Sequence, residues 1–439
     1  MSRGTGLPGA LARVVNKQRS RCLFHWRASD GSLTPLTGQT PTFARASIGS
    51  AVPDQQGQLW TPPHSLPGWA TVDTDGDGTR DSTALLLDRG GTNLCLQSEN
   101  FGTTWATIST PTRVAGILTL GSLTLDNLSD TSAAALQGYS QPITFTGDGT
   151  KALSLFWRKG SGTTAIRLRQ TSGTPADRHL STIADDGTGA PTVTTATGQK
   201  LDPELWGLDP KFGSKVYRIG LQATGVVAAQ TNQIEVYPAT TSGLATANTG
   251  DVIVGGVQVE NAAIPTGYVK TTTATVTRTR DSLTYAIGFL PRDLTLYVRL
   301  VRPWWAALSG DIGLAPEILS IGNAAPRLEL YFTQASRTIT VSITDGSTAV
   351  SAAQAIPSGA ILEVAVQFQR MRSGVQVRMD VGAGFGAFSS AGAGIAAWGA
   401  QTLTLGDAAW AAGNTLGVPL LAAKAAGGLL TLDQMRQIL

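Results

Sequence analysis

Short stretches in which apolar and polar residues alternate dominate the chain from about residue 110 onward. Each stretch is rich in β-branched residues and is bounded by Gly, Pro, Asp or Ser, which is the pattern of a half-buried strand between turns. Many short strands at this spacing are typical of β-sandwiches. The stretches are Lys151–Arg158, Thr164–Gln170, Lys215–Leu221, Asp251–Glu260, Leu294–Val301, Arg327–Phe332, Thr338–Thr344, Leu362–Phe368 and Val375–Val381.

Helical periodicity is confined to the end of the chain. Thr431–Leu439 follows a Gly-Gly pair, with Thr431 placed as an N-cap and Asp433 in the first turn, and this predicts a short helix. The predicted fold class is therefore all-β. It comprises a turn-rich N-terminal region, two antiparallel β-sandwich (jelly-roll) domains and a short C-terminal helix.

Shifts in composition divide the chain into three parts. Residues 1–100 are rich in turns, Pro and charge, and we interpret them as an N-terminal assembly or attachment region that contains an Asp-rich loop. Residues 101–272 hold one set of strands, and residues 281–439 hold a second set and the helix. The run Thr271–Arg280 bridges the two. This division agrees with a usual domain size of about 100–200 residues.

The surface of this protein must be poor in charge. Of its 439 residues, 42% are hydrophobic and only 14% are charged, against about 25% in an average protein. Such a surface suits strand-rich domains and faces covered by neighbouring subunits. The formal net charge is +3, and the basic residues are scattered, so we expect no nucleic-acid partner. Without a run of 18 apolar residues or a secretory signal, we expect no membrane span and no export.

An aspartate-rich loop, DTDGDGTRD, is the sharpest local motif. Three carboxylates stand at alternate positions, a glycine permits a sharp turn, and a fourth carboxylate follows. Oxygen ligands at this spacing form the first part of a calcium loop, although the carboxylate expected at its twelfth position is replaced by Ala84. The alternative is an exposed Asp-Gly turn between strands. The predicted ligands of a structural Ca²⁺ are Asp73, Asp75, Asp77, Thr79 and Asp81.

Motifs for catalysis are missing from the sequence. The three histidines are far apart, and Cys22 and Cys95 are the only cysteines, so no zinc spacing occurs. Two free thiols are the preferred interpretation, with a Cys22–Cys95 bridge as the alternative. No nucleophile elbow or phosphate-binding loop is present. A distant carboxylate pair for glycan cleavage remains open, but we interpret its candidates as solvated turn or strand-face residues: Asp185, Asp186, Glu235 and Glu260.

Aromatic residues are the usual platform for binding sugars. Trp157 alternates with apolar residues within a predicted strand, and we assign it to a core. Trp304 and Trp305 are adjacent, so within a strand they point to opposite faces. They are the candidates for carbohydrate binding, against the alternative that they contact a core or a second subunit.

Three segments together resemble a group of phage tail and virion structural proteins. The first is Thr42–Ser47 (TFARAS). The second is Ala84–Asn100 (ALLLDRGGTNLCLQSEN), followed by Phe101. The third is Val254–Thr271 (VGGVQVENAAIPTGYVKT). The resemblance covers roughly residues 40–280. It implies that residues 101–272 form a jelly roll similar to carbohydrate-binding modules, followed by a sandwich similar to concanavalin or laminin-G domains.

The resemblance implies a non-enzymatic virion structural protein, either tail-associated or capsid-decorating, that assembles on the particle and contacts the host surface. Its expected partners are other virion proteins, further copies of the chain (a trimer) and a host-surface glycan. Its expected location is the virion, after synthesis in the host cytoplasm and release by lysis. A dedicated carbohydrate-binding adhesin and a glycan-cleaving enzyme are the alternatives. The enzyme would need two carboxylates about 5–10 Å apart in a cleft.

Overall fold

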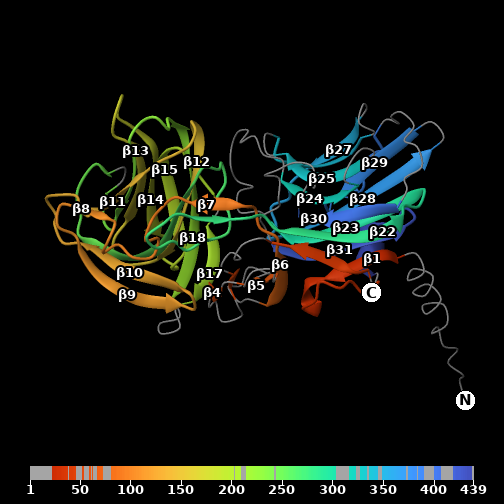
Figure 1. The fold of residues 1–439 in the computed structure, drawn as a ribbon, viewed down its shortest axis with the longest axis horizontal. Coiled ribbons are helices and arrows are strands. Elements are labelled where there is room, and N and C mark those ends of the chain that lie inside the picture. The colour runs from red at the N-terminus through yellow and green to blue at the C-terminus, as the bar shows by residue number, and fades with distance from the viewer. Residues whose placement is uncertain are drawn as a thin grey trace, which may run out of the picture.

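The computed structural model describes residues 22–37, 39–45, 52–53, 59–60, 62, 67–72, 81–201, 203–208, 214–241, 244–302, 316–322, 327–333, 336–344, 349–371, 374–382, 384–389, 400–406 and 419–437. Antiparallel strands make up nearly all of the regular structure in these residues, and they form two sandwiches that lie side by side (Figure 1). The predicted all-β fold class is confirmed. No helix within the described ranges has the length and apolar character needed to cross a membrane.

The first sandwich contains the strands from β8 to β20. One of its sheets has the order β16-β18-β12-β20-β10-β9, with β17 also paired to β18, and the other has the order β15-β14-β13-β19-β11-β8. In the first sheet the strands are β9 (Thr112–Leu120), β10 (Leu123–Asp130), β12 (Gly149–Arg158), β16 (Gln199–Lys200), β17 (Glu204–Leu208), β18 (Lys215–Val226) and β20 (Gly250–Glu260). In the second they are β8 (Ala106–Ile108), β11 (Gly138–Ile143), β13 (Thr164–Gln170), β14 (Ala176–Asp185), β15 (Pro191–Thr197) and β19 (Asn232–Tyr237).

The core of the first sandwich lies between these two sheets. Leu155 and Trp157 of β12 belong to the same buried cluster as Ile166 and Leu168 of β13, in the facing sheet. Apolar side chains at alternate positions share one face of a strand, so the periodicity seen in the sequence directs them inward. The assignment of Trp157 to a core is confirmed.

The second sandwich is built from strands at both ends of the chain. One sheet has the order β29-β28-β23-β31-β6-β5, with β1 also paired to β31, and the other has the order β2-β22-β30-β24-β25-β26-β27. The first sheet comprises β1 (Cys22–Arg27), β5 (Gly68–Val72), β6 (Ser82–Leu86), β23 (Asp293–Val301), β28 (Ile361–Met371), β29 (Gly374–Asp380) and β31 (Pro419–Gly427). The second comprises β2 (Pro41–Ala44), β22 (Ser282–Phe289), β24 (Glu317–Ile321), β25 (Arg327–Thr333), β26 (Thr338–Thr344), β27 (Ala349–Ala355) and β30 (Ala400–Leu405).

Four N-terminal strands belong to the second sandwich. Both β1 and β6 pair with β31, β5 pairs with β6, and β2 pairs with β22. The strand pairings therefore do not follow the predicted division at residue 100. The physical reason is that β31 would leave an unpaired edge without β1 and β6, and these strands supply its missing hydrogen bonds. Two further pairs are β3 (Val52–Pro53) with β4 (Leu59–Trp60), and β7 (Gly91–Asn93) with β21 (Val276–Arg278).

The predicted strands and the predicted helix are confirmed at the residue level. Each alternating stretch coincides with a strand to within a few residues. The one α-helix among the described residues, α2 (Leu432–Gln437), starts at a capping box. The Thr431 hydroxyl accepts the Gln434 backbone N–H (3.2 Å), and the side-chain Oε1 of Gln434 accepts the Thr431 N–H (2.8 Å). Leu432 and Met435 pack on the outer face of a second-sandwich sheet. A single 3-10 turn, η1 (Ala28–Asp30), follows β1.

Candidate functional site

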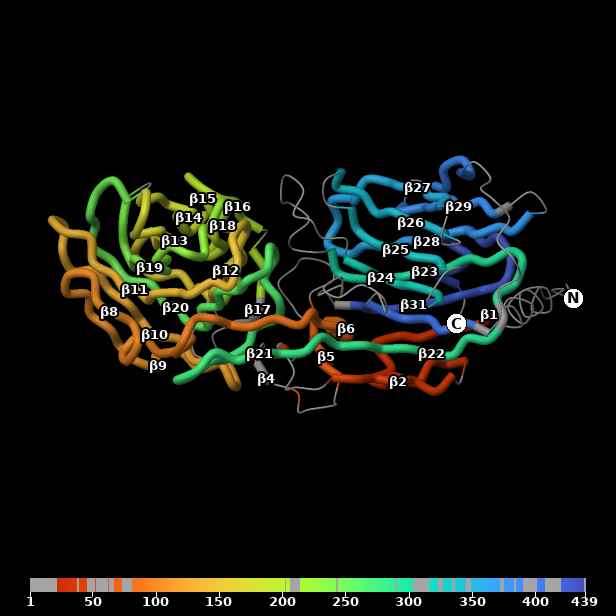
Figure 2. The backbone as a smooth tube through the Cα atoms, turned by 45° about the horizontal axis from the view of Figure 1, so that its top comes forward, coloured from red at the N-terminus to blue at the C-terminus, as the bar shows by residue number. Residues whose placement is uncertain are grey.

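The chain passes between the two sandwiches twice, and the two passages are paired with each other. Asn93 in β7 lies opposite Val276 in β21, and Gly91 lies opposite Arg278. Figure 2 shows the two segments running side by side from one sandwich to the other. We use the name junction for Arg45, residues 88–93, residues 258–271 and residues 276–281. It includes Arg45 from the first of the three segments on which the family resemblance is based, residues 88–93 from the second and residues 258–271 from the third.

An ion pair between residues 236 positions apart stands at one end of the junction. The Arg45 guanidinium donates two parallel hydrogen bonds to the Asp281 carboxylate, from Nε at 2.5 Å and from Nη2 at 2.7 Å. The same carboxylate accepts the Asp88 backbone N–H (3.0 Å), and Asp281 donates its own N–H to the Asp88 carbonyl (2.9 Å). Burial raises the pKa of Asp281, and the Arg45 guanidinium counteracts this. Because the two hydrogen bonds between the guanidinium and the carboxylate are parallel, they fix the relative orientation of the two chain segments.

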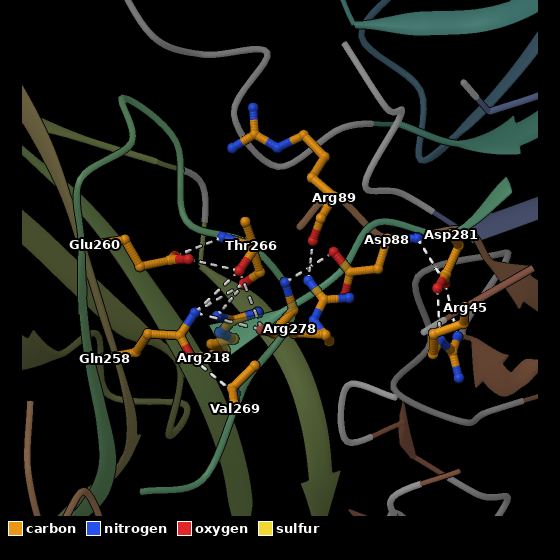
Figure 3. A network of polar contacts seen from close by, with 11 residues as sticks. Arg45, Asp88, Arg89, Arg218, Gln258, Glu260, Thr266, Val269, Arg278 and Asp281 are labelled. Atoms are coloured by element: carbon orange, nitrogen blue, oxygen red, sulfur yellow. Dashed lines mark hydrogen bonds and ion pairs between the residues drawn. The ribbon is translucent and has the colours of Figure 1, made fainter. Parts of the chain in front are cut away.

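A second buried pair lies in the middle of the junction (Figure 3). Arg278 Nη1 lies 3.0 Å from the Asp88 carboxylate, and its Nη2 donates to the Arg89 carbonyl. The other Asp88 oxygen accepts the Gly267 N–H (3.0 Å). Arg89 in turn donates to the Ile264 carbonyl (2.5 Å), and burial lowers its pKa. Asp88 thus ties both passages to the loop after β20.

The Glu260 side chain organises that loop. It accepts the backbone N–H of Thr266 at 2.7 Å and the hydroxyl of Thr266 at 2.6 Å. Gly91 lies directly against this contact, since a Cβ at that position would stand 2.3 Å from Glu260 Oε1 and 2.7 Å from Thr266 Oγ1. Glycine is therefore required at this point of β7 for close approach of the two segments. Glu260 is buried, which corrects its interpretation as a solvated residue.

Two amide side chains complete the junction. Asn93 donates to the carbonyls of Val257 (3.2 Å) and Val269 (2.9 Å), and its own carbonyl accepts two backbone N–H groups. Gln258 accepts the Val269 N–H at 2.7 Å, and its amide lies near Thr266. Arg218 reaches the same loop from β18, donating to the Thr266 carbonyl at 2.5 Å, and burial lowers its pKa. Most of the buried polar groups of the junction are hydrogen-bonded within it, with Arg278 Nε an exception among the described residues, so its chemistry is that of a rigid joint.

A polar cleft of about 380 Å³ opens on the first sandwich. Its lining residues are Gln97, Glu99, Asn100, Arg113, Ala115, Gly116, Thr124, Asp126, Lys270, Thr271 and Thr272. A bulge in edge strand β9 shapes it: Leu118 lies opposite Leu125 and Val114 opposite Asn127, so three residues of β9 face Asp126 alone. Gly116 takes a left-handed conformation there (φ 60°), which glycine adopts without strain.

The two carboxylates of the cleft are committed to the protein itself. Asp126 accepts hydrogen bonds from Arg113 Nε (2.6 Å), Gly116 N (2.8 Å) and Phe101 N (3.1 Å). Glu99 accepts hydrogen bonds from Lys270 Nζ (2.6 Å), Tyr268 Oη (2.8 Å) and Thr124 N (3.1 Å). A general acid or nucleophile needs a free oxygen directed at its substrate. This pair is therefore poorly arranged for glycan cleavage.

The predicted calcium and carbohydrate residues fall mainly outside the described residues. This applies to Asp73, Asp75, Asp77 and Thr79 and to the Trp304–Trp305 pair. Asp81 is among the described residues and is exposed. Its N–H donates to the Val72 carbonyl (3.1 Å), next to the first pair of residues that joins β5 to β6. In the described ranges, no three His, Cys, Asp or Glu side chains gather as metal ligands do. The calcium site stays a prediction.

The remaining candidate residues are free thiols or carboxylates that pair with other side chains of the protein. Cys22 and Cys95 are both free thiols, which confirms the preferred interpretation, and burial raises the pKa of each. Glu235 is buried, accepts the Tyr237 hydroxyl (2.8 Å) and pairs with Arg167, so it too was wrongly interpreted as solvated. Asp185, at the end of β14, pairs with Lys159.

Sequence reasoning missed the junction and the cleft. The signal that could have revealed the junction is the run VTRTRDS at residues 276–282, in which arginines alternate within an otherwise uncharged strand and an aspartate follows. A charge that points inward from a strand needs a buried partner. The partners, Arg45 and Asp88, lie far away in sequence, so the pairing itself was not predictable.

Comparisons with known proteins do not identify a family for this chain. No protein-family model matches it, and no curated protein matches it. Among solved structures, it shows likeness to domains LG4-5 of the mouse laminin alpha1 chain, with 10% sequence identity and a TM-score of 0.22, over 74% of this chain and 93% of that chain. A likeness this weak carries no argument. The class that the strand pairings define is an all-β protein of two antiparallel sandwiches.

Proposed function

We propose that this chain is a non-enzymatic structural protein of a bacteriophage particle, either tail-associated or capsid-decorating. The observation that supports the proposal is the junction. The second and third of the segments that resemble virion proteins contact each other directly, through Asn93 with Val269 and through Arg89 with Ile264. Arg45 of the first segment pairs with Asp281, ten positions beyond the end of the third. Segments that interlock in this way act as one structural signature, which strengthens the resemblance.

The proposed role needs a rigid connection between the two sandwiches. Two paired passages and two buried ion pairs hold them together at the junction. A single flexible linker would let two domains move independently, whereas a double connection transmits orientation from one to the other. On a particle, such a joint would hold one sandwich at a set distance and direction from the other.

Particle composition tests this proposal. Virions banded on a density gradient from a lysate of the phage that encodes this chain should contain its peptides in mass spectrometry, and antibodies against the purified protein should label the particle surface in electron microscopy. Abundant chain in the lysate together with none in the banded particles would overturn the proposal. A host protein of similar abundance controls for contamination.

We further propose that the chain acts as a homo-oligomer, with three subunits as the expected number. The support is its low content of charged residues, which suits faces buried between subunits. Light scattering of the purified full chain should then give about three times the monomer mass of 45.6 kDa. A strict monomer, both free and when extracted mildly from particles, would refute this state.

A carbohydrate-binding adhesin is the second candidate function, and the polar cleft favours it. The cleft presents amides, hydroxyls and charged groups close together, and these are the groups that fix the orientation of a polar ligand. The host-surface glycan would be held by the first sandwich while the second anchors the chain. Binding of the purified protein to a glycan array or to host cells tests this candidate, and no signal on either would eliminate it.

A further inference from the structure

We infer that the polar cleft of the first sandwich binds the carboxylate group of an acidic sugar residue in a surface polysaccharide. The inference rests on the adhesin candidate and adds the chemical class of its ligand. It follows from which hydrogen-bonding groups in the cleft are already used and which are still available.

The carboxylate and amide oxygens of the cleft already accept hydrogen bonds from the protein. Glu99 and Asp126 each accept three hydrogen bonds from within the chain. The side-chain Oδ1 of Asn100 accepts two more hydrogen bonds, from Arg113 Nη2 (2.7 Å) and from the backbone N–H of Gly102 (2.8 Å). A ligand that mainly donates hydrogen bonds would have to displace one of these contacts, which lowers its affinity.

Donors, by contrast, are available. Arg113 uses Nε on Asp126 and Nη2 on Asn100, and its Nη1 group has no acceptor among the described residues. Lys270 uses two of its three ammonium hydrogens, on Glu99 and on the Ser122 carbonyl (3.3 Å). The Asn100 amide group is also unused within the described ranges. Three donors on one cleft match the acceptor-rich edge of a carboxylate.

The position of Arg113 depends on a glycine. A Cβ at Gly102 would stand 2.0 Å from Arg113 Nη1, so any other residue there would push the guanidinium away. The Arg113 side chain is 22% exposed, held at its inner end by Asp126, while the Lys270 side chain is 48% exposed. The first cation is thus fixed in place and the second can adjust to the ligand. Preorganised donors of this kind bind anions at low entropic cost.

The charge balance of the cleft disfavours a doubly charged ligand. Two cations, Arg113 and Lys270, are paired with two anions, so the four groups sum to zero before a ligand binds. A carboxylate leaves the occupied cleft at one negative charge, whereas a dianionic phosphate monoester would leave it at two, beside two buried carboxylates. Among anionic groups, the charge balance therefore favours a carboxylate over a phosphate monoester.

The surroundings of the cleft suit a sugar ring. Thr124 and Thr272 line it with hydroxyls that can both donate and accept, as sugar hydroxyls require. Val114 and Ile117, 54% and 51% exposed, lie on the same bulged strand, and they are two of the three large hydrophobic side chains that are exposed among the described residues. Apolar side chains at such an edge can cover the C–H face of a sugar ring.

The experiment compares two forms of one polymer on the full chain. Polygalacturonate and its carboxyl-reduced, neutral product are titrated against the protein by calorimetry at low and at moderate salt. Binding of the acidic form should be stronger by about tenfold or more, as expected for loss of a charge-assisted contact, and should weaken as salt rises. A protein-derived acidic polymer, polyglutamate, should bind no better than the neutral product.

Lys270→Gln and a matched control locate the site. Lys270→Gln should reduce binding of the acidic polymer, while Lys159→Gln should not. Lys159 is a matched control because its side chain is similarly exposed (47%) and is also ion-paired, but its partner Asp185 lies outside the cleft lining. Equal losses in both variants would overturn the inference, since general attraction would then explain the binding. Equal binding of both polymers also overturns it, yet leaves the adhesin candidate standing. No binding of any glycan, on arrays or on host cells, removes both.

Discussion

His179 makes the first sandwich sensitive to acid. This residue is fully buried in β14, and its Nδ1 lies 3.0 Å from the Gln222 carbonyl of β18 in the facing sheet. The carbonyl can only accept, so Nδ1 carries the proton in the neutral ring. Nε2 is buried with no hydrogen-bond partner among the described residues. Gly198 makes room for the ring, since a Cβ there would stand 2.5 Å from Nδ1. A second proton would place an unpaired charge between the sheets.

The size of the effect follows from the two pKa values. Burial lowers the pKa of His179 to about 4 in the folded protein, whereas a histidine in an unfolded chain titrates near about 6.5. Above about pH 6.5 both states are neutral, and the full stability is present. As the pH falls from there toward 4, the unfolded state gains the proton first, so stability is lost. A gap of about 2.5 between the pKa values corresponds to about 3 kcal/mol.

The assay is hydrogen exchange of peptides from β14 and β18, with intrinsic rates corrected for pH, in the wild-type chain and in His179→Gln. Glutamine can still donate to the Gln222 carbonyl but does not titrate. The difference in opening free energy between the two proteins should change by about 3 kcal/mol between pH 7 and pH 4. Other titrating groups cancel in this difference. Parallel profiles for the two proteins would refute the reasoning.

Three further predictions concern the junction and the aspartate-rich loop. Asp281→Asn leaves Arg45 buried without its charge partner and should cost about 3–5 kcal/mol in unfolding free energy. Full stability in denaturant titration would contradict the role of this pair. Gly91→Ala should cost about 1–3 kcal/mol because its Cβ would meet Glu260 and Thr266. Gly147→Ala, where the space is open, is the control, and equal losses would refute the close approach. Calcium added to metal-stripped protein should raise its melting temperature, and Asp75→Asn should abolish the rise. No heat of binding and no change in melting temperature would exclude the site.

The sequence was informative where the pattern of residues within a single strand is enough to predict which of its side chains are buried. In β25 polar and apolar residues alternate and the burial alternates with them, so the buried face could be predicted without knowledge of the neighbouring strands. The capping box of α2 is local in the same sense. The strands β1 and β6 could not be assigned to a sheet, because their partner β31 lies near the other end of the sequence.

The site residues were harder to predict, for a related reason. A buried glutamate such as Glu260 and a solvated one look alike in sequence, and only the fold brings Thr266 against it. The cleft depends on a bulge in β9, and the run Val114–Leu118 in this strand has no alternation of polar and apolar residues that would have predicted it. The aspartate-rich loop is the opposite case: its motif is plain in the sequence, and its calcium ligands still await the metal titration.

The shared edge of β31 has a consequence for how the protein is made. This strand leaves the ribosome after every other strand among the described residues, yet it pairs with β1, β6 and β23. The first sandwich draws all of its strands from residues 106–260, so it can close during translation. The strands β1 and β6 must wait until residues 419–427 have been made, and a chain truncated before residue 419 would release a folded first sandwich beside an unpaired, aggregation-prone set of strands.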